Sequence, residues 1–146
     1  MSKWVYVTGI VRADTFAKTS AEAMYIGQTT INHLPRVWGS EGDANLHVIL
    51  EDGHNCSSNV DEYDQFSNLY NDPHFKFFDF QTNILITISG QLRDASFDTA
   101  LRETVSMLCR LSKKVCVSEC CVLVRDCFGK EAVIKDKNGW MESLND

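Results

Sequence analysis

The sequence predicts an α+β fold in which a mainly antiparallel sheet of four strands carries two helices on one of its faces. Three observations indicate this fold. Hydrophobic residues alternate in four segments and recur at helical spacing in two others, and the two halves of the chain resemble each other. The 146 residues, 44% of them hydrophobic, fit a core of ordinary size, so we expect a single domain over residues 1–146.

The first half of the chain predicts a strand, a helix and a second strand. Trp4–Arg12 alternates as a strand does, and Thr19 with Glu22 forms a capping-box pattern that begins a helix. Pro35 is expected to end this helix near residue 34, because its ring disfavours helical backbone in the preceding residue. The next strand is predicted over Asn45–Glu51. The apolar face of the helix comprises Met24, Ile31, Leu34 and Trp38.

The second half predicts the same order of elements, followed by a hairpin. Gln81–Arg93 is rich in Ile and Thr, as strands are, and Ser96 is a typical N-cap for the helix that follows. Val115–Asp126 is predicted as a strand, and Gly129 marks a turn into a short strand over Glu131–Lys135. The apolar face of the second helix comprises Phe97, Leu101, Val105, Leu108 and Leu111.

The two halves resemble each other in sequence as well as in element order. VTGIVRADTF at 7–16 lies over ISGQLRDASF at 88–97, which pairs Gly9 with Gly90 and Phe16 with Phe97. LHVILEDGH at 46–54 similarly lies over CCVLVRDCF at 120–128. We interpret this as a duplicated βαβ unit, which predicts a ferredoxin-like βαββαβ sandwich. The expected segments are copy one at about 3–52, a connection at 53–80, copy two at about 81–128, and a C-terminal hairpin and tail at 129–146.

The stretch GQLRDASF at 90–97 has a glycine, an aliphatic residue two positions later and a phenylalanine seven positions later. In this it resembles the strand-to-helix turn of acylphosphatases, which are small ferredoxin-like enzymes. The resemblance implies the same fold but not the same activity. Asp94 and Ser96 stand where that family has phosphate-cradling glycines, and Asp98 stands where it has its catalytic arginine.

The six cysteines do not form a recognisable metal or redox motif. The chain contains no CxxC, and strand alternation sends Cys120 and Cys121 to opposite faces of the sheet. We therefore expect the cysteines to be buried small hydrophobic residues in a reducing compartment, with no bound metal and no cofactor. Two alternatives remain open: a zinc site that combines Cys56, His54 and His47, and a redox role for the thiols.

Composition also limits the location and the partners of the protein. No apolar run reaches the length of a membrane span, and the N-terminal residues show no signal-peptide cleavage pattern. The net charge of −6 opposes general attraction to nucleic acid or anionic lipid. We expect a cytoplasmic protein that binds neither nucleic acid nor membrane. The motifs of common nucleotide-binding, hydrolytic and calcium sites are also missing, so we favour a non-enzymatic protein over a small hydrolase.

The stretch from Val37 to Phe75 is acidic, because it contains several Asp and Glu residues and no Lys or Arg. The connection at 53–80 is unusually long and interleaves aromatic with acidic residues. It could form a short helix that packs on the sheet. The hypothesis we favour is an interaction module, such as an inhibitor or regulator, that binds a basic protein partner. The candidate residues are Glu51, Asp52, Asp61, Glu62, Tyr63, Asp64, Phe66 and Tyr70.

An alternative hypothesis is a homo-oligomeric protein that binds an anionic small molecule, such as a nucleotide or metabolite, through Arg12, Arg36 and Arg93. Arg12 and Arg93 end neighbouring antiparallel strands, so within one copy they are expected at opposite edges. A dimer could bring such residues together. We also expect at least a dimer because two helices leave one sheet face uncovered. Trp4, Tyr6, Ile84, Ile86 and the cysteine-rich strand predict that both faces are apolar.

Overall fold

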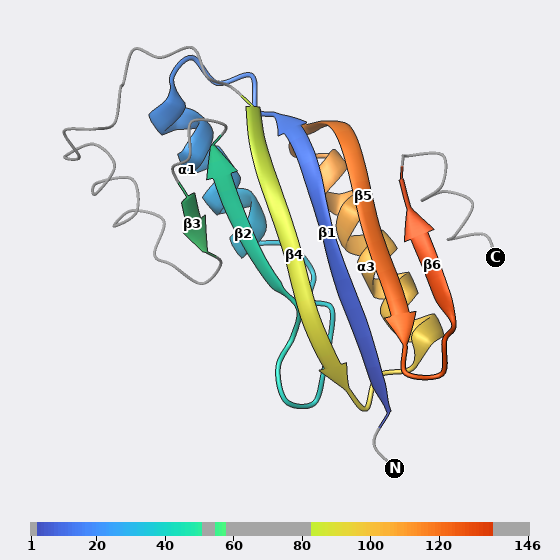
Figure 1. Ribbon diagram of the computed structural model, residues 1–146. Coiled ribbons are helices and arrows are strands. Elements are labelled where there is room, and N and C mark those ends of the chain that lie inside the picture. The colour runs from blue at the N-terminus through green and yellow to red at the C-terminus, as the bar shows by residue number, and fades with distance from the viewer. Residues whose placement is uncertain (1–2, 51–54, 58–82, 136–146) are drawn as a thin grey trace.

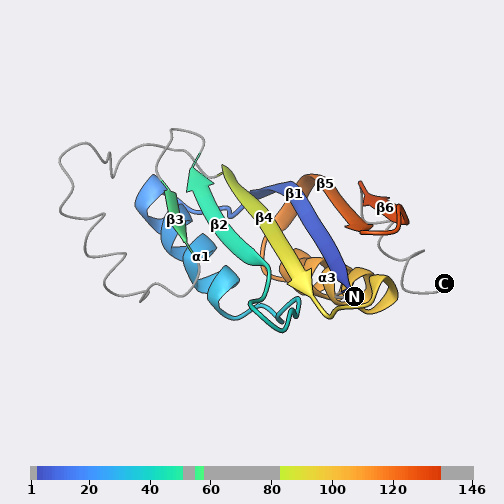
Figure 2. The ribbon, with the colours of Figure 1, turned by 60° about the horizontal axis from the view of Figure 1, so that its bottom comes forward.

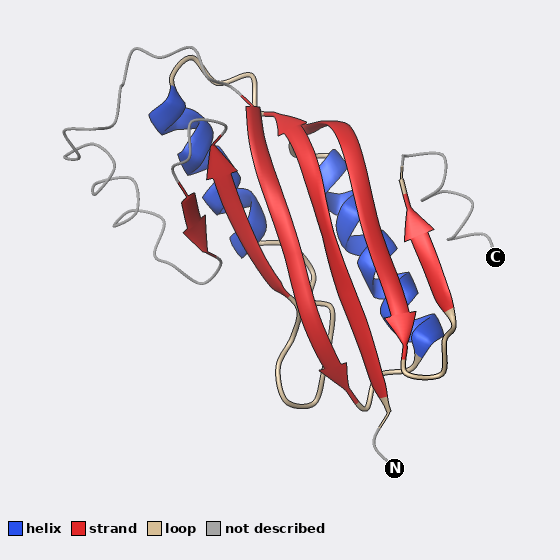
Figure 3. Ribbon diagram, viewed as in Figure 1, coloured by secondary structure: helices blue, strands red, loops and turns tan. Residues whose placement is uncertain are grey.

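The computed structural model describes residues 3–50, 55–57 and 83–135 of the chain. Its strands and helices follow one another in the order that the sequence predicts, with one additional short strand, β3. Figure 1 shows the elements by label, and Figure 3 shows helices and strands in separate colours. The elements are β1 (Trp4–Asp14), α1 (Ser20–Asn32), β2 (Asn45–Leu50), β3 (Asn55–Ser57), β4 (Asn83–Arg93), α3 (Phe97–Ser112), β5 (Cys116–Asp126) and β6 (Glu131–Ile134).

The strands form one six-stranded sheet in the order β3-β2-β4-β1-β5-β6, and every neighbouring pair is antiparallel. The central strand β1 lies between β4 and β5, and each of these three strands has 11 residues. Both helices pack on the same face of the sheet, behind the strands in the view of Figure 1 and beneath them in Figure 2. The predicted α+β class is therefore confirmed.

Side-chain caps begin both helices where the sequence predicts them. The Thr19 hydroxyl accepts a hydrogen bond from the Glu22 N–H at 3.2 Å, and the Glu22 carboxylate accepts one from the Lys18 N–H at 3.1 Å. The Ser96 hydroxyl likewise accepts the Thr99 N–H at 3.2 Å. The assignment of Leu34 and Trp38 to the first helix face is wrong, because α1 ends at Asn32. Leu34 still packs against the core from beyond the helix, whereas Trp38 is exposed.

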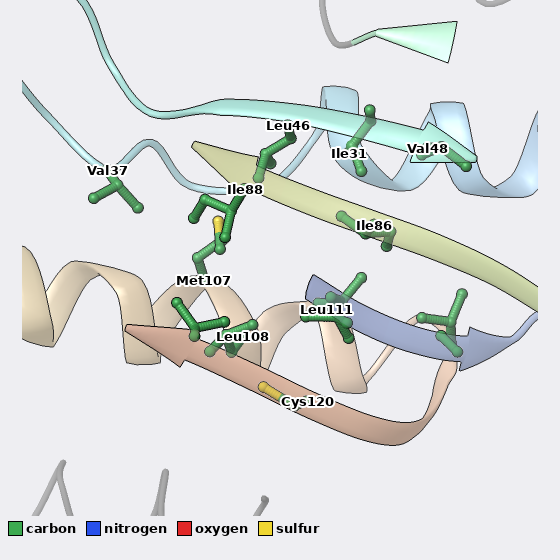
Figure 4. Packing of buried hydrophobic residues seen from close by; sticks show 14 of the residues in the cluster. Ile31, Val37, Leu46, Val48, Ile86, Ile88, Met107, Leu108, Leu111 and Cys120 are labelled. Atoms are coloured by element: carbon green, nitrogen blue, oxygen red, sulfur yellow. The ribbon is translucent and has the colours of Figure 1, made fainter. Parts of the chain in front are cut away.

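The core lies between the helices and the sheet. In β1 and β4 every second residue points toward the helices, as period-two alternation requires, and all of these residues except Gly9 and Gly90 are buried. Figure 4 shows this packing from close by, with side chains from both helices against side chains from the strands. The buried residues labelled there are Ile31, Val37, Leu46, Val48, Ile86, Ile88, Met107, Leu108, Leu111 and Cys120.

The two copies of the proposed repeat differ where their helices begin. Phe97 is the first residue of α3 and packs against the core. Phe16 precedes α1 by several residues, has a φ angle of 55° and is 73% exposed. The predicted equivalence of these two phenylalanines is therefore wrong, because the turn from strand to helix is longer in the first half.

None of the helices in the part of the chain that the structure describes is long and apolar enough to cross a membrane.

Candidate functional site

The sheet has a second face, opposite the helices, that we call the open face. It is formed by the side chains that alternate with the buried ones, such as Ile10 and Arg12 on β1. Cross-strand register places Arg12 between Leu85 and Glu119, and it places Ile10 beside Cys121. Of the residues from which apolar character was predicted for both faces, Ile84 and Ile86 are buried on the helix side, whereas alternation places Trp4 and Tyr6 on the open face.

A shallow depression of about 560 Å³ lies on the open face over β4, β1 and β5. A β-bulge in β5 borders it, where the register shifts beside Arg12 and the Ser118 hydroxyl donates to the Arg12 carbonyl oxygen at 3.2 Å. The depression combines aliphatic side chains with one guanidinium and one carboxylate. Such a lining suits a group with an apolar body and a polar end. The lining residues are Ile10, Arg12, Leu85, Glu119, Cys120 and Cys121.

The three arginines of the predicted anion site do not meet in one copy of the chain. Arg93 lies at the other end of the open face from Arg12, where it contacts the ring of Trp4 and forms an ion pair with Glu41. Arg36 is highly exposed in the segment after α1, where it borders a separate crevice of about 330 Å³. The expected separation of Arg12 from Arg93 is confirmed.

Two acidic residues that precede β2 in the arginine- and lysine-free stretch are paired with these arginines. Glu41 pairs with Arg93, and Asp43 lies 3.6 Å from the Arg36 guanidinium. These carboxylates therefore partly neutralise the cations that were proposed to hold an anionic ligand.

The candidate partner-binding residues lie outside the described residues. They are Glu51, Asp52, Asp61, Glu62, Tyr63, Asp64, Phe66 and Tyr70. The structure does describe the strands that flank them. β2 ends at Leu50, β4 begins at Asn83, and Leu50 is the register partner of Ile84. The two ends of the acidic aromatic segment are therefore attached at adjacent ends of the neighbouring strands β2 and β4, and its residues 55–57 form β3 beside β2.

The cysteines divide between core and surface. Cys120 is buried, with its Sγ 3.6 Å from the Ile134 carbonyl oxygen, whereas the adjacent Cys121 is exposed on the open face. The predicted orientation of this pair toward opposite faces is confirmed. The prediction that the cysteines are core residues is wrong for three of them, because their positions on the open face or in a turn leave them exposed. These are Cys116, Cys121 and Cys127.

The alternative zinc site is only partly covered by the structure. His47 is exposed on β2, His54 lies outside the described residues, and so does the side chain of Cys56. Within residues 3–50, 55–57 and 83–135, no three His, Cys, Asp or Glu side chains are grouped closely enough to hold a metal ion.

Sequence reasoning recognised Arg12 but missed the other residues of the depression. Alternation does place Ile10, Leu85 and Cys121 on one face of their own strands. It does not give the register between strands, which brings residues from three distant parts of the chain together.

Comparison with known proteins gives no family for the chain. No family model, curated protein or solved structure matches it. Inference about function therefore depends on the chemistry and arrangement of its own residues.

Proposed function

We propose that the protein is a non-enzymatic interaction module of the cytoplasm, which regulates or inhibits a basic protein partner through the acidic aromatic segment at 53–80. The observation that carries this proposal is the attachment of the segment. Leu50 and Ile84 are register partners at its two ends, so a turn of a few residues would suffice to join β2 to β4. Residues 55–57 of the segment form the edge strand β3, and joining β2 to β4 does not require the rest of its length, which supports a binding role for that remaining part.

The charge of the segment favours a basic partner. Residues 51–75 include Glu51, Asp61, Glu62 and Asp64 and contain no Lys or Arg. A concentration of like charge accelerates association with a partner of opposite charge and makes the rate depend on salt. Interleaved Tyr and Phe supply the large contact areas that are typical of interface centres.

The test is a charge reversal with a matched control. Asp61, Glu62 and Asp64 are replaced together by lysine, and the control variant replaces Asp136, Glu142 and Asp146 by lysine. Both variants change the net charge equally, so only the position of the change differs. The partner is first captured by cross-linking in extract of the source cells. Its association rate with each purified variant is then measured over a series of NaCl concentrations.

We expect the segment variant to associate roughly 10-fold or more slowly than wild type and to lose most of the salt dependence. The control variant should retain most of the wild-type rate. Equal rates for wild type and the segment variant, with folding intact by circular dichroism, would show that the segment is not the binding surface.

A second candidate function is the binding of an anionic small molecule, and the position of Arg12 in the depression favours it. Arg12 lines the depression together with aliphatic Ile10 and Leu85 and with Glu119, its register partner on β5, and its cation could pair with the acidic end of a ligand. Thermal-shift screening of nucleotides and metabolite acids compares wild type with Arg12→Gln. Arg36→Gln is the control because Arg36 borders a different crevice. A ligand that stabilises wild type and Arg36→Gln but not Arg12→Gln would support this function.

We also propose that the fold arose by duplication of a βαβ unit with the ferredoxin-like plan. When Gly9 is placed on Gly90, buried residues of β1 coincide with buried residues of β4. Both glycines permit a close approach: an added Cβ would lie 2.5 Å from the Cys121 carbonyl oxygen at Gly9 and 2.9 Å from the Ala44 Cα at Gly90. The coinciding buried pairs are Val5 with Ile86, Val7 with Ile88, and Val11 with Leu92.

A further inference from the structure

An apolar band crosses the open face diagonally from β2 to β6. Three register pairs form it. Going from β2 to β6, each pair lies two residues further toward the β1 N-terminus than the pair before it. Diagonal neighbours on a sheet face are close enough for side-chain contact, so the band is continuous across five strands. Ile10 lies at its centre and is 43% exposed. The pairs are Ile49 with Leu85, Ile10 with Cys121, and Leu123 with Val133.

Charged residues of both signs surround this band. In the strands that the structure describes, alternation and register place three arginines and three carboxylates on the open face, whereas the whole chain has a net charge of −6. These six strand positions thus carry no net charge on an acidic molecule, and Arg93 among them is also paired with Glu41 beside the face. The six residues are Arg12, Arg93, Arg125, Asp14, Glu119 and Glu131.

The open face is also large enough for a stable interface. With strands about 4.8 Å apart and about 3.3 Å per residue, β2, β4, β1, β5 and β6 together present roughly 700 Å². A standard protein interface buries about 800 Å² on each partner, so this face alone supplies most of that area.

We propose that the open face binds the open face of a second copy of this chain and forms a two-fold symmetric dimer. A two-fold interface must be complementary to itself, and a band of apolar side chains that packs on the same band of its partner meets that condition. Two acidic molecules repel each other over most of their surfaces. They can approach closely where that surface carries no net charge, and the balanced charges offer each copy both signs to pair with.

This proposal is independent of the acidic aromatic segment, which is attached at adjacent ends of β2 and β4. It also gives the depression beside Arg12 an occupant, because side chains of the second copy would enter it. A basic or acidic partner of another kind is less well matched, since the balanced face attracts neither sign.

The first test is sedimentation velocity at low and at high micromolar concentration for wild type, Ile10→Lys and Tyr25→Lys. Tyr25 lies on α1, away from the open face, and is 39% exposed, so it matches Ile10 in exposure. We expect wild type and Tyr25→Lys to dimerise with similar affinity. Ile10→Lys should raise the dissociation constant of the dimer at least about 100-fold. In both copies it places a charge where an aliphatic side chain would be buried in the interface.

The second test uses unaltered protein, so it does not depend on whether a variant folds. Iodoacetamide alkylation of Cys121 on the open face is compared with that of Cys109 on α3 by mass spectrometry. Cys121 should become at least about 10-fold slower to react at high protein concentration than at low concentration, as expected if most of the protein is dimeric. Cys109 should react at the same rate throughout.

Three outcomes would overturn the proposal. The first is a protein that stays monomeric at high micromolar concentration and whose Cys121 reacts freely, which would show that the open face is not covered. The second is a monomer whose Cys121 is protected at every concentration, which assigns the face to another segment of the same chain. The third is a dimer that Ile10→Lys leaves unchanged, which places the interface elsewhere.

Discussion

At the scale of single residues, Phe16 combines an unfavourable backbone conformation with an exposed side chain. Its φ angle of 55° lies in the left-handed region, which costs a bulky residue about 1–2 kcal/mol. Its N–H donates to the Asp14 carboxylate at 2.8 Å, which holds the turn in place. The ring is 73% exposed, so its contacts within a single chain offset little of the energy that the left-handed backbone costs.

We predict that Phe16→Asn raises the free energy of unfolding by about 0.5–1 kcal/mol, because asparagine tolerates left-handed backbone. The matched control is Phe128→Asn. Phe128 is 74% exposed and its N–H donates to the Asp126 carboxylate at 2.9 Å, yet its φ angle is not positive. Urea unfolding should show a gain for the first variant and none for the second; equal changes would indicate that backbone strain at Phe16 is negligible.

At the scale of elements, α3 is stabilised by a cap at its first turn and by the apolar face that it packs on the sheet. The Ser96 hydroxyl accepts the Thr99 N–H and donates to the Thr99 hydroxyl at 2.8 Å. The cap satisfies a backbone donor that the helix cannot satisfy internally. The cap fixes the residue at which α3 begins. Leu108 and Leu111 are fully buried further along the same helix, so a stable helix start also supports their packing in the core.

Removing this cap should therefore weaken the whole fold. We predict that Ser96→Ala lowers the free energy of unfolding by about 1 kcal/mol, whereas Ser96→Asp retains it because aspartate also caps and favours the helix N-terminus. Ser89→Ala on the exposed face of β4 is the control and should change stability by less than about 0.5 kcal/mol. Thermal unfolding measures all three, and a loss at Ser89 as large as that at Ser96 would argue against a capping role.

At the scale of the whole molecule, the uneven distribution of charge gives the two proposed interactions opposite responses to salt. Dimerisation brings together two chains of net charge −6 over a balanced face, so screening should reduce their mutual repulsion. Binding of a basic partner to the acidic segment depends on attraction, which screening reduces.

We predict that raising NaCl from about 0.01 M to 0.15 M, which shortens the Debye length from about 30 Å to 8 Å, lowers the dissociation constant of the dimer. The same change should slow association of the basic partner. Sedimentation equilibrium follows the first effect, and stopped-flow kinetics follows the second. A dimer that weakens as salt is added would mean that ion pairs between the copies, rather than the apolar band, dominate the interface.

Local signals in the sequence were enough to predict most elements of the fold. Alternation, content of strand-forming residues and turn signals located β1, β2, β4, β5 and β6, and caps with helical spacing located α1 and α3, because each pattern reports on contacts within one segment. The strand β3 was not predicted, since Asn55–Ser57 is short and polar and pairs only with β2. Burial of Cys120 and exposure of Cys121 also follow from alternation once one face of β5 is covered.

The sequence by itself determined the class of the fold, the order of its elements, and the concentration of acidic residues between the two halves. Only the tertiary structure decided that the helices cover the face containing Ile84 and Ile86, and that Arg93 pairs with Glu41. It also decided that Arg12 shares a depression with Leu85 and Glu119. The physical reason is that these relations depend on strand register, which is set by the packing of the complete sheet on both helices and joins residues far apart in the chain.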